Sequence, residues 1–257
     1  MNYQDINAET ITRWIADGWK WGIPIDRETY EKAKNGEWDV LLTPKKSVPH
    51  SWFGDIRGKR ILGLASGGAQ QIPIFSALGA HCTVLDYNDK QLEAERIVSE
   101  REGYSVEIVK ADMSKPLPFE SKNFDIIFNP PSLCYIEKVE PLLFECARVL
   151  KERGTLLITF ENGINYITDE NDESKISQSL PFNPIKDPTL FREEDRYQFS
   201  HSLTEQIGGL IKAGFIIRDM YEDTNGYGLF DELHIPSFIA INAIKAPSEV
   251  WESLSGK

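Results

Sequence analysis

From Lys59 onward, apolar runs alternate with amphipathic stretches, a pattern typical of βαβ units that build a parallel sheet. The short apolar runs predict strands near residues 60–65, 81–86, 105–109, 124–129 and 154–160. Helical spacing of apolar residues predicts helices near residues 70–79, 88–102 and 137–150. Right-handed crossovers would place these strands in one sheet.

The two ends of the chain depart from this rhythm. Residues 1–57 carry five of the six tryptophans, and the stretches 7–17 and 26–35 predict short helices. Residues 214–245 predict a last pair of strands, near 215–221 and 237–244, which we expect to be antiparallel.

Residues 162–202 are acidic and proline-rich, and they precede a predicted helix at 203–213. Insertions of this size usually cover a site or are partly disordered. We therefore divide the chain into an N-terminal segment (1–57), an α/β domain (58–246) containing the insertion, and a tail (247–257).

Composition narrows the possible partners. The 28 Lys and Arg residues against 40 Asp and Glu residues leave a net charge of −12, which disfavours nucleic acid and anionic membranes. No apolar run approaches the roughly 18 residues of a membrane helix, so we expect a soluble protein. Three cysteines without a CxxC pair favour the reducing cytoplasm over a disulfide framework.

The first predicted strand runs into small residues, in the sequence ILGLASGGAQQ (61–71). Such a turn lets backbone N–H groups approach a ligand. The second strand ends in Asp86, eighteen residues after Gly68, where a carboxylate could accept hydrogen bonds from two ribose hydroxyls. Each feature alone also fits a tight turn or a helix cap, but together they indicate an adenosine ligand.

The third strand ends in Asp112 and Met113, which could meet the edge and face of an adenine. The glycine turn is also a one-substitution variant of GxGxxG, so these features alone leave a nicotinamide oxidoreductase open.

The succession ILGLASGGAQQ, TVLDYNDKQLEAER, KADMSKPLPFESKNFDIIFNPPS and ARVLKERGTLLITF resembles the class I S-adenosylmethionine-dependent methyltransferases over residues 59–245. The helix carrying ARVLKERG is similar to the small-molecule branch, in an uncharacterised bacterial group. This resemblance implies a Rossmann-like, doubly wound sheet of seven strands, mostly parallel with one antiparallel strand. It also implies S-adenosylmethionine as the cofactor and residues 58–246 as the catalytic domain.

Carried over by motif, the family's cofactor-binding positions fall on Ala65, Ser66, Gly67, Gly68, Gln70, Asp86, Tyr87, Asp112, Met113, Asn129 and Pro130. Asp86 would bind the ribose and Tyr87 would pack on the adenine. Asp112 and Met113 would line the adenine amino edge, and Asn129 would lie where the fourth strand opens toward the methyl group.

The glycine motif departs from the family at three positions. Gly63 replaces the usual acid, and Ala65 and Ala69 replace two glycines. Without that acid, the cofactor's ammonium group needs another partner, which the N-terminal segment could supply.

The fourth strand ends in Asn129-Pro130-Pro131-Ser132, which is similar to the Asn-Pro-Pro-aromatic motif of amino-methyltransferases. In that chemistry the Asn orients the target amine and the aromatic residue stacks on the base. Ser132 cannot stack, so we favour a rigid strand exit that shapes the cofactor site. Methylation of an amino group in nucleic acid or protein remains an alternative.

A hydroxyl or protonated amine acceptor would need a general base, and His201, after the insertion, is the first candidate for this catalytic role beside Asn129. His50, in the N-terminal connector, is the second, and for both histidines a surface or structural role is the alternative. His81 and His234 flank strands and are interpreted as structural, and no spacing predicts a metal site.

The N-terminal tryptophans could form a lid over an apolar or cationic acceptor, or serve as core for an added helical layer. The leading hypothesis is methyl transfer to a small molecule held between the N-terminal segment, the fourth-strand exit and residues 162–202. A non-catalytic protein that binds an adenosine ligand is a further alternative.

Overall fold

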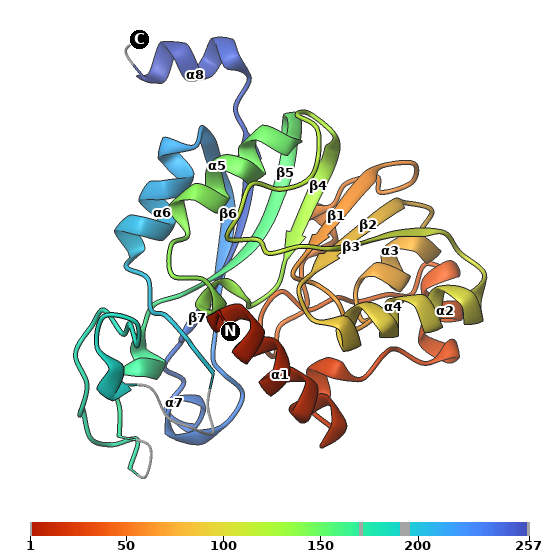
Figure 1. Ribbon diagram of the computed structural model, residues 1–257. Helices are drawn as coiled ribbons and strands as arrows, with labels where there is room; N and C mark the ends of the chain where they lie inside the picture. Colours follow the sequence, from red (N-terminus) through yellow and green to blue (C-terminus); the bar gives the residue numbers. More distant parts are fainter. Residues whose placement is uncertain (1, 170–171, 191–195, 256–257) are drawn as a thin grey trace.

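A seven-stranded sheet forms the centre of the computed structural model, which describes residues 2–169, 172–190 and 196–255 (Figure 1). The strands are β1 (Arg60–Leu64), β2 (His81–Asp86), β3 (Val106–Lys110), β4 (Phe124–Asn129), β5 (Leu150–Glu161), β6 (Phe215–Asp223) and β7 (Phe238–Lys245). Their order is β3-β2-β1-β4-β5-β7-β6, and β7 runs antiparallel to both of its neighbours. The predicted doubly wound sheet with one antiparallel strand is confirmed.

Helices pack on both faces of the sheet (Figure 1). The helices of the described chain are α1 (Tyr3–Ala16), α2 (Arg27–Lys34), α3 (Ile72–Ala77), α4 (Asp89–Glu102), α5 (Glu140–Val149), α6 (Leu203–Lys212), α7 (Gly228–Glu232) and α8 (Ser248–Ser255), of which α8 projects away from the sheet. Short 3-10 turns lie at η1 (Lys20–Gly22), η2 (His50–Trp52), η3 (Leu133–Tyr135), η4 (Ile164–Tyr166) and η5 (Pro188–Leu190). The segment expected to be a tail is thus largely the helix α8.

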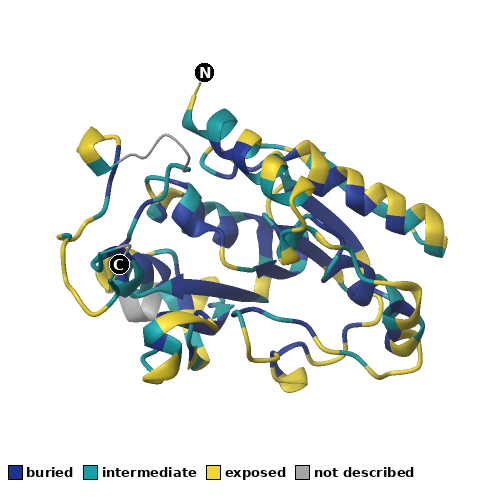
Figure 2. Cartoon of the chain, turned by 90° about the horizontal axis from the view of Figure 1, so that it is seen from below, coloured by how far each residue is buried: buried dark blue, intermediate teal, exposed yellow. Residues whose placement is uncertain are grey.

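Alternation along the strands produces two cores, because successive side chains point to opposite faces. Ile127 of β4 belongs to the core under α5 and α6, and Ile126 and Phe128 belong to the opposite core. Figure 2 shows the result: the central strands are buried along their length, whereas the helices bury one side only.

The N-terminal segment contributes to the second core. Leu42, Trp52 and Phe53 are buried against the sheet, and the Trp52 indole N–H donates to Asp219 of β6 over 2.9 Å. Trp38 packs beside them. These tryptophans therefore serve as core, in contrast to others described below.

The first helix begins four residues before its predicted start. The Asn2 side chain accepts the Asp5 N–H over 2.8 Å and the Asp5 carboxylate accepts the Asn2 N–H, which forms a capping box. In Figure 1 this helix lies across the lower edge of the sheet.

The end of the 162–202 insertion packs on α1. The Asn7 amide donates to the Tyr197 carbonyl over 3.0 Å and accepts the Tyr197 N–H over 2.7 Å. Residues 170–171 of the acidic run, and 191–195, lie outside the described residues. The insertion and the N-terminal helix, far apart in sequence, thus meet at one edge of the sheet.

Cys82, Cys134 and Cys146 are buried free thiols. Among the helices that the structure describes, none is both long and apolar enough to cross a bilayer.

Candidate active site

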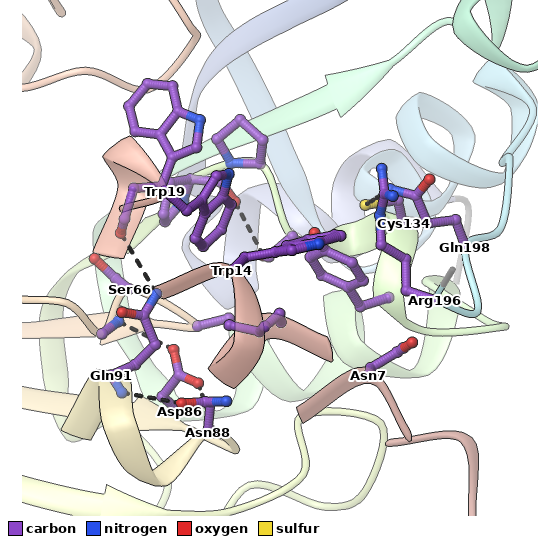
Figure 3. Close-up of a pocket in the computed structure, with 18 of the residues that line it drawn as sticks. Asn7, Trp14, Trp19, Ser66, Asp86, Asn88, Gln91, Cys134, Arg196 and Gln198 are labelled. Atoms are coloured by element: carbon purple, nitrogen blue, oxygen red, sulfur yellow. Dashed lines mark hydrogen bonds between the residues drawn. The ribbon is translucent and has the colours of Figure 1, made fainter. Parts of the chain in front are cut away.

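A cavity of about 890 Å³ opens at the edge where β1, β2, β3, β4 and β5 end. In an open α/β sheet, ligands bind outside the carboxyl ends of the parallel strands. The N-terminal segment, the insertion and the chain after β6 complete the walls. Figure 3 shows Ser66 and Asp86 on one side of Trp14, and Cys134, Arg196 and Gln198 on the other.

Nine of the predicted cofactor residues line this cavity: Ala65, Ser66, Gly67, Gln70, Asp86, Tyr87, Asp112, Met113 and Pro130. They come from the ends of four strands, so the fold brings them together. Gly68, Asn129 and His201 do not line it.

The glycine turn follows β1 directly and keeps the backbone that its motif requires. Ala65 and Ala69 adopt φ values of +48° and +55°, in the left-handed region that favours glycine. An alanine there costs roughly 1 kcal/mol. The turn therefore retains its shape at both positions where the motif lacks glycine.

Helix α4 holds this turn from behind. The Gly68 N–H donates to the Gln91 carbonyl over 3.0 Å, and the Ala69 N–H donates to the buried Glu95 carboxyl over 2.7 Å. Gly68 has φ +98°, and a Cβ there would lie 2.7 Å from the Gln91 side-chain oxygen. Gly68 is thus required by the geometry of the turn although it does not line the cavity.

The missing acid of the motif has a steric explanation. A Cβ at Gly63 would lie 2.6 Å from the Ile72 methyl carbon and 3.2 Å from the Ser66 Cβ. No side chain fits there without a shift of Ile72. A carboxylate that serves the cavity must therefore come from elsewhere.

Asp86 ends β2 with its carboxylate beside the turn. One oxygen accepts the Gly67 N–H over 3.1 Å, and the other accepts the Asn88 N–H over 2.9 Å. Burial raises the pKa of Asp86, and these backbone hydrogen bonds oppose that shift. A Cβ at Gly67 would lie 2.9 Å from this carboxylate, so only glycine allows the close approach.

The next residues tie the site to α1. The Tyr87 hydroxyl donates to Asp5 over 2.6 Å, and this hydrogen bond raises the pKa of Tyr87. The Asn88 amide donates to the Ala8 carbonyl over 2.7 Å and to the Thr12 hydroxyl over 2.9 Å. The orientation of α1 over the cavity is thus set by the end of β2.

Two further predicted residues have partners within the chain. The Gln70 amide donates to the carbonyls of Lys20 and Ile23 over 2.8 and 2.9 Å, which joins the turn to the N-terminal segment. The Asp112 carboxylate accepts the Ser114 N–H over 2.8 Å, and Met113 is buried beside it.

Asn129 is fully buried and acts within the strand exit. Its amide donates to the Leu64 carbonyl over 2.7 Å and to the Ser132 hydroxyl over 2.9 Å, and that hydroxyl donates to the Pro130 carbonyl. Both amide hydrogens are therefore used inside the chain. The side-chain oxygen of Asn129, the atom that would accept a hydrogen from a target amine, is buried without a partner among the described residues. Because Pro130 and Ser132 line the cavity and Asn129 does not, the rigid strand exit is favoured.

Neither histidine considered as a base lines the cavity. His201 is buried with its Nε2 atom 3.1 Å from the Leu133 carbonyl, and burial lowers its pKa. His50 stacks on Trp38 at a centroid distance of 3.9 Å, outside the cavity.

Sequence reasoning missed a titratable group at the far end of the cavity. Glu161 ends β5 and lines the cavity together with Cys134, Tyr135 and Tyr166. The sequence did contain a signal for Glu161, because this acid lies at the end of a predicted parallel strand, as Asp86 does, and such strands end at the same edge of the sheet.

Other tryptophans of the N-terminal segment face the cavity. Trp14, Trp19 and Trp21 line it, with the Trp14 and Trp19 rings 5.5 Å apart. The Arg196 guanidinium lies 4.5 Å from the Trp14 ring centre. The segment thus supplies both a cavity wall and, through Trp52, core.

The sequence and the fold are similar to those of known methyltransferases. Residues 62–158 match the model of a methyltransferase domain. The chain is 35% identical to the "Uncharacterized methyltransferase YbaJ" of Bacillus subtilis over 249 residues, which cover 93% of this chain and 97% of the relative.

More distant similarities agree with this. The chain is 28% identical to a ubiquinone/menaquinone biosynthesis C-methyltransferase of Azotobacter vinelandii over 56% of this chain and 57% of that protein. The crystal structure of an S-adenosylmethionine-dependent methyltransferase from Mesorhizobium loti has a TM-score of 0.62 at 19% identity, over 76% of this chain and 94% of that one. The chain therefore belongs to the class I S-adenosylmethionine-dependent methyltransferase family, as its motifs predicted.

Proposed function

We propose that this enzyme transfers the methyl group of S-adenosylmethionine to a small-molecule acceptor bound in the same cavity. The observation that carries the proposal is the Asp86 carboxylate, which faces the cavity beside the open glycine turn. The cofactor supplies an electrophilic methyl group on a sulfonium sulfur. The chain's own residues bind the two molecules, align them and exclude water.

The described residues fit the cofactor. Each Asp86 carboxylate oxygen has a second lone pair, which can accept a hydrogen bond from a ribose hydroxyl. The Tyr87 ring, Asp112 and Met113 can surround an adenine. The ammonium group requires acceptors that Gly63 cannot provide. Gln4 and Asp17 of the N-terminal segment line the cavity and can supply them.

A small acceptor agrees with the size and enclosure of the cavity. Small-molecule sites usually span about 300–1,000 Å³, so 890 Å³ lies near the upper end and can hold a cofactor with a second molecule. Residues of α1 and of the insertion form walls of this cavity. Because all three cysteines are free thiols, we place the reaction in the cytoplasm.

Calorimetry with S-adenosylhomocysteine tests the part of the proposal that concerns cofactor binding. Asp86→Ala is expected to weaken binding by about 1–3 kcal/mol, or roughly 5–150-fold, because charge-assisted hydrogen bonds are lost. Asp89→Asn, an exposed acid three residues later and outside the cavity, is the matched control and should bind as the wild type does. Failure of the wild-type protein to bind at millimolar concentration would end the proposal.

A further inference from the structure

The end of the cavity that is remote from the glycine turn is lined by a carboxyl that the proposed cofactor contacts do not use. Glu161 lies at the end of β5, three strands across the sheet from Asp86 at the end of β2. With neighbouring strands 4.7–4.9 Å apart, the two strand ends are separated by roughly 14 Å. The cavity thus holds two carboxylates at opposite ends, one beside the glycine turn and one remote from it.

Titratable and charged groups surround Glu161 from three segments. Tyr166 follows β5, Cys134 and Tyr135 lie on η3, and Arg196 approaches from the end of the insertion. Burial raises the pKa of Glu161 to about 7, and hydrogen bonds from Tyr166 and Cys134 and the charge of Arg196 oppose this shift. The carboxyl therefore exchanges its proton within the physiological range.

Four other carboxylates stand among the described lining residues, Asp17, Asp86, Asp112 and Glu173, and the last three accept backbone N–H groups. Both Asp86 oxygens accept backbone N–H groups, and Asp112 accepts the Ser114 N–H. Glu173, on the insertion, accepts the Leu229 N–H. With His201 outside the lining, Glu161 is the group best placed to exchange a proton with a molecule at the far end.

The walls around Glu161 indicate the body of the acceptor. Tyr135, Tyr166, Phe230 and Phe238 line the cavity, and Phe238 of β7 is the strand partner of Glu161. In Figure 3, Trp14 lies between Asp86 on one side and Cys134 and Arg196 on the other. Aromatic walls beside the Glu161 carboxyl suit an apolar or aromatic molecule that carries one hydrogen-bond donor.

We propose that the acceptor is an aromatic or apolar molecule bearing a hydroxyl or amine, and that the Glu161 carboxylate accepts the proton of this group during methyl transfer. The inference rests on the proposed function. The acceptor's oxygen or nitrogen forms the new bond to the methyl carbon, and the carbon–sulfur bond breaks with its electron pair going to sulfur. The acceptor's proton passes to Glu161 and then to solvent.

The test uses full-length protein with two probes, catechol and phenethylamine, and S-adenosylmethionine labelled in its methyl group. Mass spectrometry should detect transfer to at least one probe, with a rate that rises through pH 7. Glu161→Gln, which keeps the size of the side chain, is expected to lower the rate at pH 8 by about 10²–10⁴-fold. The exposed Glu37→Gln serves as the control and should match the wild type.

Two measurements separate this inference from the proposed function. In the unliganded protein, carbon-13 NMR should show a carboxyl that titrates near pH 7 and is absent from Glu161→Gln. S-adenosylhomocysteine should bind the Gln variant as tightly as the wild type, which also shows that the variant is folded. Two results would overturn the role of Glu161 and leave the proposed function standing. One is that protein which binds S-adenosylhomocysteine methylates neither probe, and the other is that Glu161→Gln methylates a probe at the wild-type rate.

Discussion

At the scale of single residues, the glycine turn depends on a buried acid behind it. Glu95 is fully buried on α4, with one oxygen accepting the Ala69 N–H over 2.7 Å and the other without a partner among the described residues. Burial raises the pKa of Glu95 to about 8. The neutral acid is therefore the form that the folded protein prefers.

The sign of the resulting pH dependence follows from linkage. Because the folded pKa lies above the unfolded value of about 4.3, the stabilising contribution of Glu95 is complete below pH 4 and is lost as the pH rises to about 8. Glu95→Gln keeps an acceptor for the Ala69 N–H and cannot ionise. Urea unfolding at pH 5, 7 and 8.5 should show the variant gaining stability relative to the wild type as the pH rises. A constant difference between the two proteins at all three pH values would contradict this account.

At the scale of elements, the cavity exists because α1 and the end of the insertion are joined. Asn7 is buried and makes both of its hydrogen bonds to the Tyr197 backbone, while Tyr87 and Asn88 hold the same helix from β2. The Asn7–Tyr197 hydrogen bonds link residues 190 apart in sequence, and those of Tyr87 and Asn88 link residues 82 and 80 apart.

Asn7→Ala should loosen this junction. The Tyr197 N–H and carbonyl would lose their partners, at a cost of about 1–3 kcal/mol in the free energy of unfolding. Hydrogen exchange should rise in α1 and in residues 196–202 while the central strands stay protected. Glu9→Ala changes an exposed position of the same helix and should leave the exchange pattern unaltered. Unchanged exchange in Asn7→Ala would show that the junction is held by other contacts.

At the scale of the whole molecule, charge determines which partners can approach. The net charge is −12, and the Lys45–Lys46 pair is engaged: Lys45 pairs with Asp231 over 2.7 Å and Lys46 donates to the Glu222 carbonyl. Fluorescence anisotropy at 50 mM salt should therefore detect no binding of duplex DNA or transfer RNA at micromolar protein. Binding that weakens steeply with salt would instead revive nucleic acid as an acceptor.

Local pattern was sufficient for the sheet, and the resemblance to methyltransferases implied most of the cofactor end of the cavity. Strand β2 matches its predicted span, and nine predicted residues line the cavity, because parallel strands deliver their carboxyl ends to one edge. Element ends were less predictable. The capping box at Asn2, for example, moved the start of α1.

The order of apolar and polar residues by itself determined the alternation of strands and helices, the two-sided core and the acid that closes the second strand. Only the tertiary structure decided that Asn129 turns into the strand exit, that His201 is buried away from the cavity, and that Glu161 faces it. The physical reason is the separation in sequence between the residues that interact. Strand periodicity and turn geometry act between near neighbours in sequence, whereas the surroundings of Glu161 come from η3, β5 and the insertion, which meet only after the chain has folded.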